Sequence, residues 1–78
     1  MSEPVKELDL KGLKCPLPVL HTRRALLRLD AGERLIVLCT DPLSTIDIPH
    51  LVHELGDALE DSRRQDGVIV FRILRLSR

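Results

Sequence analysis

Residues 8–20 read LDLKGLKCPLPVL, and this stretch connects the first expected strand of the chain to its first expected helix. Leu8 and Leu10 alternate with acidic residues, which predicts a short, half-buried strand over residues 5–10. Gly12 interrupts the alternation, and beyond residue 16 the apolar spacing becomes that of a helix. This stretch therefore predicts a strand, a tight turn and a helix start in close succession.

The first helix is expected over residues 16–29, followed by the turn Ala31-Gly32. Its apolar side combines a central stripe with two flanking leucines: Val19, Thr22, Leu26 and Leu29, then Leu20 and Leu27. Residues 35–39 form a continuous apolar run, which predicts a strand that is covered by helices. Asp41-Pro42 ends this strand.

The second half of the chain predicts one more helix and two more strands. We expect the helix to begin between residues 44 and 49 and to run to about residue 55, with Pro49 in its first turn. Residues 58–65 are polar and predict an edge strand. Asp66-Gly67 is a strong signal for a two-residue hairpin, and residues 68–76, which are apolar on both faces of the strand, follow it as a central strand.

The expected order is β-α-β-α-β-β, within a single domain that spans residues 1–78 and has its core at about residues 5–76. The first strand, helix and second strand should form a right-handed parallel crossover, whereas the final hairpin must be antiparallel. So short a chain can share one core only if both helices cover the same face. We therefore predict an α/β two-layer sandwich with a mixed four-stranded sheet.

Composition excludes several classes of function. Twelve basic and twelve acidic residues give a formal net charge of zero, and the single aromatic residue offers no platform for base stacking. We therefore expect no direct binding of nucleic acid. We expect no membrane insertion and no signal peptide, because no apolar run approaches ~20 residues and residues 1–11 are charged. The predicted compartment is the cytoplasm, whose reducing conditions keep thiols free.

Cys15 stands where the first helix is expected to begin. Pro16 suits the first helical position, which makes Cys15 the expected N-cap, and Pro18 stiffens the first turn. Gly12 permits the turn that exposes the sulfur. The unpaired amides of a helix start lower the pKa of a thiol there. Four nearby bases either add to this effect and contact acidic patches on partners or simply form a solvated face: Lys11, Lys14, Arg23 and Arg24.

The residues alone leave two interpretations of Cys15 open. Cys15 is either a reactive thiol or a small, half-buried residue in a turn. A cysteine hydrolase would need a neighbouring base, but His21 should project from the flank of the helix, and His50 and His53 are expected to face solvent. An exposed thiolate without a base suits a carrier of sulfur.

Cys39 also has two interpretations. Two cysteines with this spacing form neither a disulfide framework nor a zinc site, so we expect no metal and no cofactor. Cys39 ends the second strand, and Cys39 and Asp41 should both lie near Cys15 at the same sheet edge, so Cys39 is a possible resolving thiol. A buried cysteine that fills a gap in the core is the interpretation that we favour. Asp41 and Asp47 are interpreted as a turn or cap carboxylate and a charge at a helix N-terminus.

Two motifs in this sequence resemble the TusA/SirA family of small sulfur-carrier proteins. The family pairs a D-x-x-G-x-x-C-P-x-P stretch with a later D-P-x-x-x-x-D-I-P stretch. The first falls on Asp9, Gly12, Cys15, Pro16 and Pro18, and the second on Asp41, Pro42, Asp47, Ile48 and Pro49. The resemblance covers nearly the whole chain and implies the same two-layer β-α-β-α-β-β fold.

The resemblance also implies a function. Cys15 would be the residue that carries persulfide sulfur, which makes the protein a sulfurtransferase that depends on other proteins. Its expected partners are a cysteine desulfurase or rhodanese-like donor and a sulfur-relay acceptor that serves tRNA thiolation, cofactor synthesis or sulfur oxidation. Cys39 departs from many relatives, which have a smaller residue there.

A different class of function stays open beside the carrier. The domain could be a non-catalytic regulatory module that binds a partner such as a membrane sulfur-compound transporter. We expect Ile69, Phe71 and Ile73 in the last strand to line a sheet face that the helices leave open. That face could also support dimerisation, so we expect a monomer or a weak homodimer.

Overall fold

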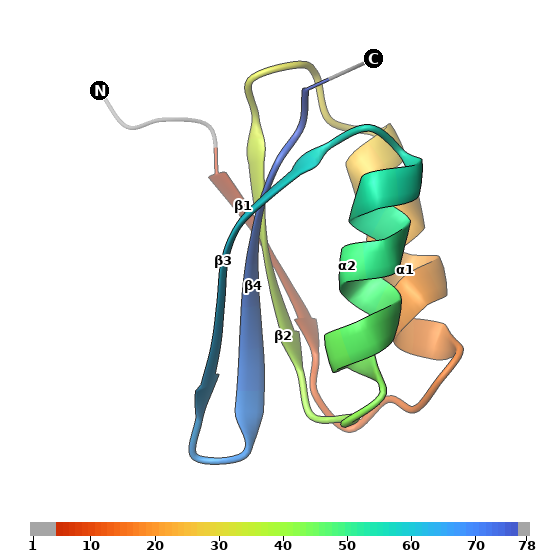
Figure 1. Cartoon of the computed structure of the whole chain (residues 1–78), viewed down its shortest axis with the longest axis vertical. Helices are drawn as coiled ribbons and strands as arrows, with labels where there is room; N and C mark the ends of the chain where they lie inside the picture. The colour runs from red at the N-terminus through yellow and green to blue at the C-terminus, as the bar shows by residue number, and fades with distance from the viewer. Residues whose placement is uncertain (1–4, 77–78) are drawn as a thin grey trace.

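The computed structural model describes residues 5–76, so residues 1–4 and 77–78 of the predicted domain lie outside it. The elements follow the predicted order: β1 Val5–Leu10, α1 Leu17–Leu27, β2 Arg34–Cys39, α2 Ser44–Glu54, β3 Ala58–Gln65 and β4 Val68–Leu74. Both helices lie on one face of the sheet, side by side (Figure 1). The prediction of a two-layer α/β sandwich is confirmed.

The sheet is mixed and has the strand order β1-β2-β4-β3. β1 pairs with β2 in parallel, whereas β4 runs antiparallel to both β2 and β3. The apolar strands β2 and β4 are central, and the polar strands β1 and β3 form the edges, as the sequence predicts. Asp66 and Gly67 both have a positive φ in the β3–β4 turn, which matches the twist of a tight hairpin.

One face of the sheet and the inner sides of the helices form the core. Alternate residues of β2 and β4 are buried there, and α1 and α2 cover them with Leu26, Ile48 and Val52. The strand residues of this layer are Leu35, Val37 and Cys39 of β2, then Ile69, Phe71 and Ile73 of β4. The prediction that Ile69, Phe71 and Ile73 line an open face is therefore wrong. Successive side chains of a strand point to opposite faces, and these three residues are on the face that the helices cover.

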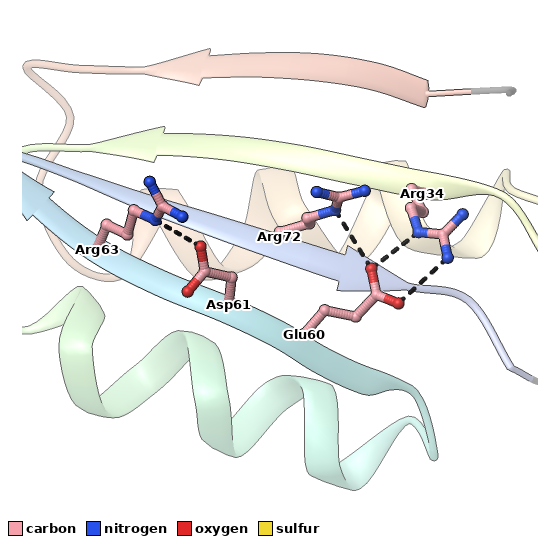
Figure 2. Close-up of polar contacts among 5 residues, drawn as sticks. All are labelled: Arg34, Glu60, Asp61, Arg63 and Arg72. Atoms are coloured by element: carbon pink, nitrogen blue, oxygen red, sulfur yellow. Dashed lines mark hydrogen bonds and ion pairs between the residues drawn. The ribbon is translucent and has the colours of Figure 1, made fainter. Parts of the chain in front are cut away.

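The open face of the sheet is charged. Figure 2 shows Glu60 of β3 between two arginines, with its Oε1 2.8 Å from Arg34 Nε and 3.4 Å from Arg72 Nε. A second ion pair joins Arg63 Nε to Asp61 Oδ2 at 2.7 Å along β3. The half-buried Ile36 and Val70 lie on this face between the charges, so it is not a continuous apolar surface.

Two helical details differ from the prediction. α2 begins at Ser44, which places Pro49 inside the helix and not in its first turn. On α1, Thr22 and Leu26 are buried as expected, but Leu20 and Leu27 are about half exposed, at 50% and 55%. The helix therefore contacts the sheet through a narrower stripe than the predicted one.

Candidate functional site

The loops after β1 and β2 lie together at one end of the sheet, next to the N-terminal ends of both helices (Figure 1). This arrangement follows from the parallel pairing of β1 with β2, in which Leu10 and Cys39 are the last partners. Gly12 has φ +87°, and its N–H donates a 2.9 Å hydrogen bond to Thr40 Oγ1. The sequence interpretation missed Thr40, which ties the two loops together.

Cys15 is exposed and is attached to the β2–α2 segment by two hydrogen bonds. Its backbone N–H donates to Asp41 Oδ2 at 2.6 Å, and its Sγ donates to Asp47 Oδ2 at 3.3 Å. Asp41 Oδ1 accepts a further bond, from the N–H of Leu43 at 3.1 Å, as a turn carboxylate does. Asp47 lies in the first turn of α2. Both carboxylates therefore have the expected local role and also contact Cys15.

The helix begins later than the sequence predicts. Pro16, not Cys15, is the N-cap of α1, and the peptide bond between Cys15 and Pro16 is cis. The N–H of Leu17 donates a hydrogen bond to the carbonyl of Lys14 at 2.9 Å, which forms a turn. The N–H of Leu20 donates to the carbonyl of Pro16 at 3.1 Å. The prediction of Cys15 as N-cap is wrong because the carbonyl of Pro16, and not that of Cys15, accepts the first hydrogen bond of the helix.

The expected lowering of the Cys15 pKa is also wrong. The pKa of this thiol is raised, first by its hydrogen bond to Asp47, then by desolvation, and then by the negative charges of Asp47 and Asp41. Lys14, Arg23 and Arg24 are exposed, and none of them contributes to the shift. The thiol is therefore mostly protonated at neutral pH.

No histidine adjoins Cys15 within residues 5–76. His21, His50 and His53 are all exposed, as expected, and His50 Nε2 lies 3.5 Å from Glu54 Oε2 on its own helix. The side chain that could accept a proton from the Cys15 thiol is instead the carboxylate of Asp47, which accepts its hydrogen bond. The arrangement lacks the cysteine–histidine pair of a hydrolase.

Cys39 is fully buried in the hydrophobic core and is free, as is Cys15. Burial raises the pKa of the Cys39 thiol, a hydrogen bond with Ser44 opposes the rise, and the charge of Asp41 adds to it. The favoured prediction of a buried strand cysteine is confirmed. A resolving role stays a prediction that requires the core to open.

Four apolar side chains are exposed around the two helix starts next to Cys15. Leu17 follows the Cys15–Pro16 bond, and Leu20 is one turn further along α1. Leu43 is the N-cap of α2, and Ile46 precedes Asp47 and is 67% exposed. An apolar rim of this kind is typical of a surface that binds another protein.

Comparisons with known proteins agree on one family. The profile of the sulfurtransferase TusA family matches residues 6–75 of this chain. The sulfur carrier protein TusA of Allochromatium vinosum is 36% identical over 73 residues, which cover 94% of this chain and 96% of the relative. The sulfur carrier protein TusA of Pseudomonas syringae pv. syringae is 36% identical, and the match covers 99% of this chain and 99% of the relative.

A solved structure shows the same fold. The crystal structure of a SirA-like protein from Desulfitobacterium hafniense superposes with a TM-score of 0.82 at 27% sequence identity. The match covers 92% of this chain and 99% of that protein.

Within residues 5–76, neither helix is long and apolar enough to cross a membrane.

Proposed function

Since the chain belongs to the TusA family of sulfurtransferases, we propose that Cys15 carries sulfane sulfur as a persulfide from a donor protein to an acceptor protein. Sulfur carriers work between a donor and an acceptor. The observation that carries the proposal is the exposed, free thiol of Cys15, held at the helix end by Asp41 and Asp47.

Loading is an exchange between two sulfur atoms and needs no external oxidant. The Cys15 sulfur attacks the terminal sulfur of a persulfide on a donor cysteine and forms a new S–S bond. The S–S bond of the donor breaks, and its electron pair leaves on the donor cysteine. That thiolate takes up the proton that Cys15 gives up. Transfer to the acceptor repeats the same exchange with Cys15 as the donor.

Three features of the site support this chemistry. Gly12, in its positive-φ turn, and Pro16 and Pro18 hold the sulfur-bearing loop in one conformation. The exposed Leu17, Leu20, Leu43 and Ile46 offer an apolar contact to both donor and acceptor. We assign Lys14, Arg23 and Arg24, all exposed, to contacts with acidic patches on these partners.

The donors that fit this chemistry are a cysteine desulfurase or a rhodanese-like protein, since both present a persulfide. The acceptor belongs to a relay for tRNA thiolation, cofactor synthesis or sulfur oxidation. The reducing cytoplasm suits the reaction, because the Cys15 thiol must stay free to accept sulfur.

The test is the intact mass of the reduced protein after incubation with a cysteine desulfurase and cysteine. We expect the wild type and Cys39→Ser to gain one sulfur atom that a reductant removes, and Cys15→Ser to gain none. Thiosulfate with a rhodanese-like donor, and then sodium polysulfide, extend the test to other sources. If no form gains sulfur from any of the three, the carrier function is excluded.

A further inference from the structure

The two carboxylates next to Cys15 contact different atoms of that residue. Asp41 accepts a bond from the backbone N–H at 2.6 Å, and this donor stays the same whether or not the cysteine carries extra sulfur. Asp47 accepts a bond from Sγ itself, at 3.3 Å. The Asp47 contact therefore depends on the thiol proton, and it is the contact that loading must change.

Loading removes the donor of that hydrogen bond. In a persulfide, Sγ is bonded to Cβ and to the terminal sulfur and carries no proton. The terminal sulfur is more acidic than an ordinary thiol, so at neutral pH it is largely an anion. The half-buried carboxylates of Asp47 and Asp41 repel a negative charge at this position. Asp47 therefore holds the empty thiol by a hydrogen bond, whereas Asp47 and Asp41 both repel the loaded sulfur.

We propose that Asp47 is a positioning residue that distinguishes the empty carrier from the loaded one: it holds the Cys15 thiol against α2 and directs the persulfide anion outward to the acceptor. This inference rests on the proposed function. It gives the empty protein a protonated and weakly reactive thiol and the loaded protein an exposed and nucleophilic sulfur.

The charges around the thiol agree with this role. On the side of α2 and its preceding loop the charged groups that act on the thiol are Asp47 and Asp41, and both raise the pKa of Cys15. On its own segment the neighbouring charges are Lys14 and Lys11, neither of which contributes to that shift. Lys11 Nζ lies 3.8 Å from Asp9 Oδ2.

The first experiment needs no sulfur donor. The rate of alkylation by iodoacetamide is measured between pH 6 and 10 in a Cys39→Ser background, where Cys15 is the reacting thiol. We expect Asp47→Asn to move the midpoint of the profile to lower pH and to raise the rate at pH 7 about three- to tenfold. The matched control is Glu54→Gln, which removes the same charge from the other end of α2 and should change the rate less than twofold.

A second substitution guards against a local folding defect. Asp47→Ser keeps a polar side chain in the first turn of α2 but removes the charge, so it should shift the profile in the same direction as Asp47→Asn. Far-ultraviolet circular dichroism of each variant checks that the helices are intact. If folded Asp47→Asn and Asp47→Ser both keep the wild-type profile, the role of Asp47 is excluded and the carrier function still stands.

The second experiment compares the empty and loaded forms. Protein loaded with sodium polysulfide is alkylated at pH 7, and products with and without the extra sulfur are separated by mass. We expect the loaded form to react faster than the empty form, and Asp47→Asn to reduce this ratio about three- to tenfold. An unchanged ratio contradicts the inference. If no form gains sulfur from polysulfide, loading is repeated with the cysteine desulfurase and with the rhodanese-like donor, and failure with all three excludes the proposed function and the loaded-state role with it.

Discussion

The guanidinium of Arg75 and the carboxylate of Asp57 form an ion pair that is hidden from solvent. Arg75 Nη1 lies 2.7 Å from Asp57 Oδ2, and the exposed fractions of the two side chains are 5% and 0%. Asp57 Oδ1 also accepts the N–H of Leu76 at 3.0 Å, and the backbone of Arg75 bonds to Gly32 and Glu33. The pair therefore joins the segment that follows β4 to the starts of β2 and β3.

Removing one partner of this pair should destabilise the fold strongly. Asp57→Ala leaves the Arg75 guanidinium buried without its carboxylate, and Arg75 Nε already has no hydrogen-bond partner among residues 5–76. We expect a loss of about 3–5 kcal/mol in the free energy of unfolding. Urea denaturation measures it. The control is Asp61→Ala on the exposed pair with Arg63, which should cost less than about 1 kcal/mol. Equal losses would contradict the structural role of the buried pair.

Glu60 should make the stability of the domain sensitive to acid. Its pKa is lowered first by the hydrogen bond from Arg34, while the charges of Arg34 and Arg72 act in the same direction. A carboxyl group with a lower pKa in the folded state than in the unfolded state stabilises the fold at pH values above its pKa in the unfolded state. This contribution is lost as the pH falls through the pKa of the folded state.

The corresponding measurement is urea denaturation of wild type and Glu60→Gln between pH 7 and pH 3. We expect Glu60→Gln to be less stable than wild type at pH 7 and the difference to shrink as the pH falls below the ordinary glutamate range. Salt should weaken the effect, since the group is exposed. A difference that is constant over this pH range would show that Glu60 acts by packing and not by its charge.

Thr22 offers a stabilising substitution. Its side chain is fully buried on the inner side of α1, and its Oγ1 has no hydrogen-bond partner within the described residues. Thr22→Val replaces the hydroxyl by a methyl group of similar size and has nearly the same helix propensity. We expect a gain of about 1 kcal/mol, because a buried polar group without a partner is costly. A loss of stability in thermal or urea unfolding would mean that the hydroxyl has a partner, such as a water molecule.

The fold could be predicted because its signals are local. The switch from alternating to helical spacing around Gly12, the apolar run of β2 and the Asp66-Gly67 turn each define an element within a few residues. The polar composition of β3 also identifies it as an edge. The face of β4 was assigned wrongly because both of its faces carry apolar residues, so periodicity could not decide which set packs on the helices.

The site was predicted less completely because its contacts are distant in sequence. The amide of Cys15 bonds 26 residues ahead, to Asp41, and its sulfur bonds 32 residues ahead, to Asp47. The residues next to Cys15 in the sequence predict that Cys15 is an N-cap with basic neighbours and that the pKa of its thiol is lowered. The parallel pairing of β1 and β2 predicts that Asp41 lies near Cys15, which the hydrogen bond to the amide confirms, but it does not predict that Asp47 reaches the sulfur. The spacing of Asp41 and Asp47 after the end of β2 was the available signal.

Cys39 should be chemically silent in the folded protein. Its side chain is fully buried, and burial raises the pKa of its thiol, so both access and thiolate content are low. We expect a disulfide reagent to label one cysteine per native chain quickly and the second only at the rate of unfolding. Cys39→Ala should cost about 1 kcal/mol of stability and leave sulfur loading on Cys15 unchanged. The matched variant Cys15→Ala should abolish the fast labelling. Rapid labelling of both thiols, or loss of loading in Cys39→Ala, would support a resolving role for Cys39 and would require the core next to Leu10 to open during transfer.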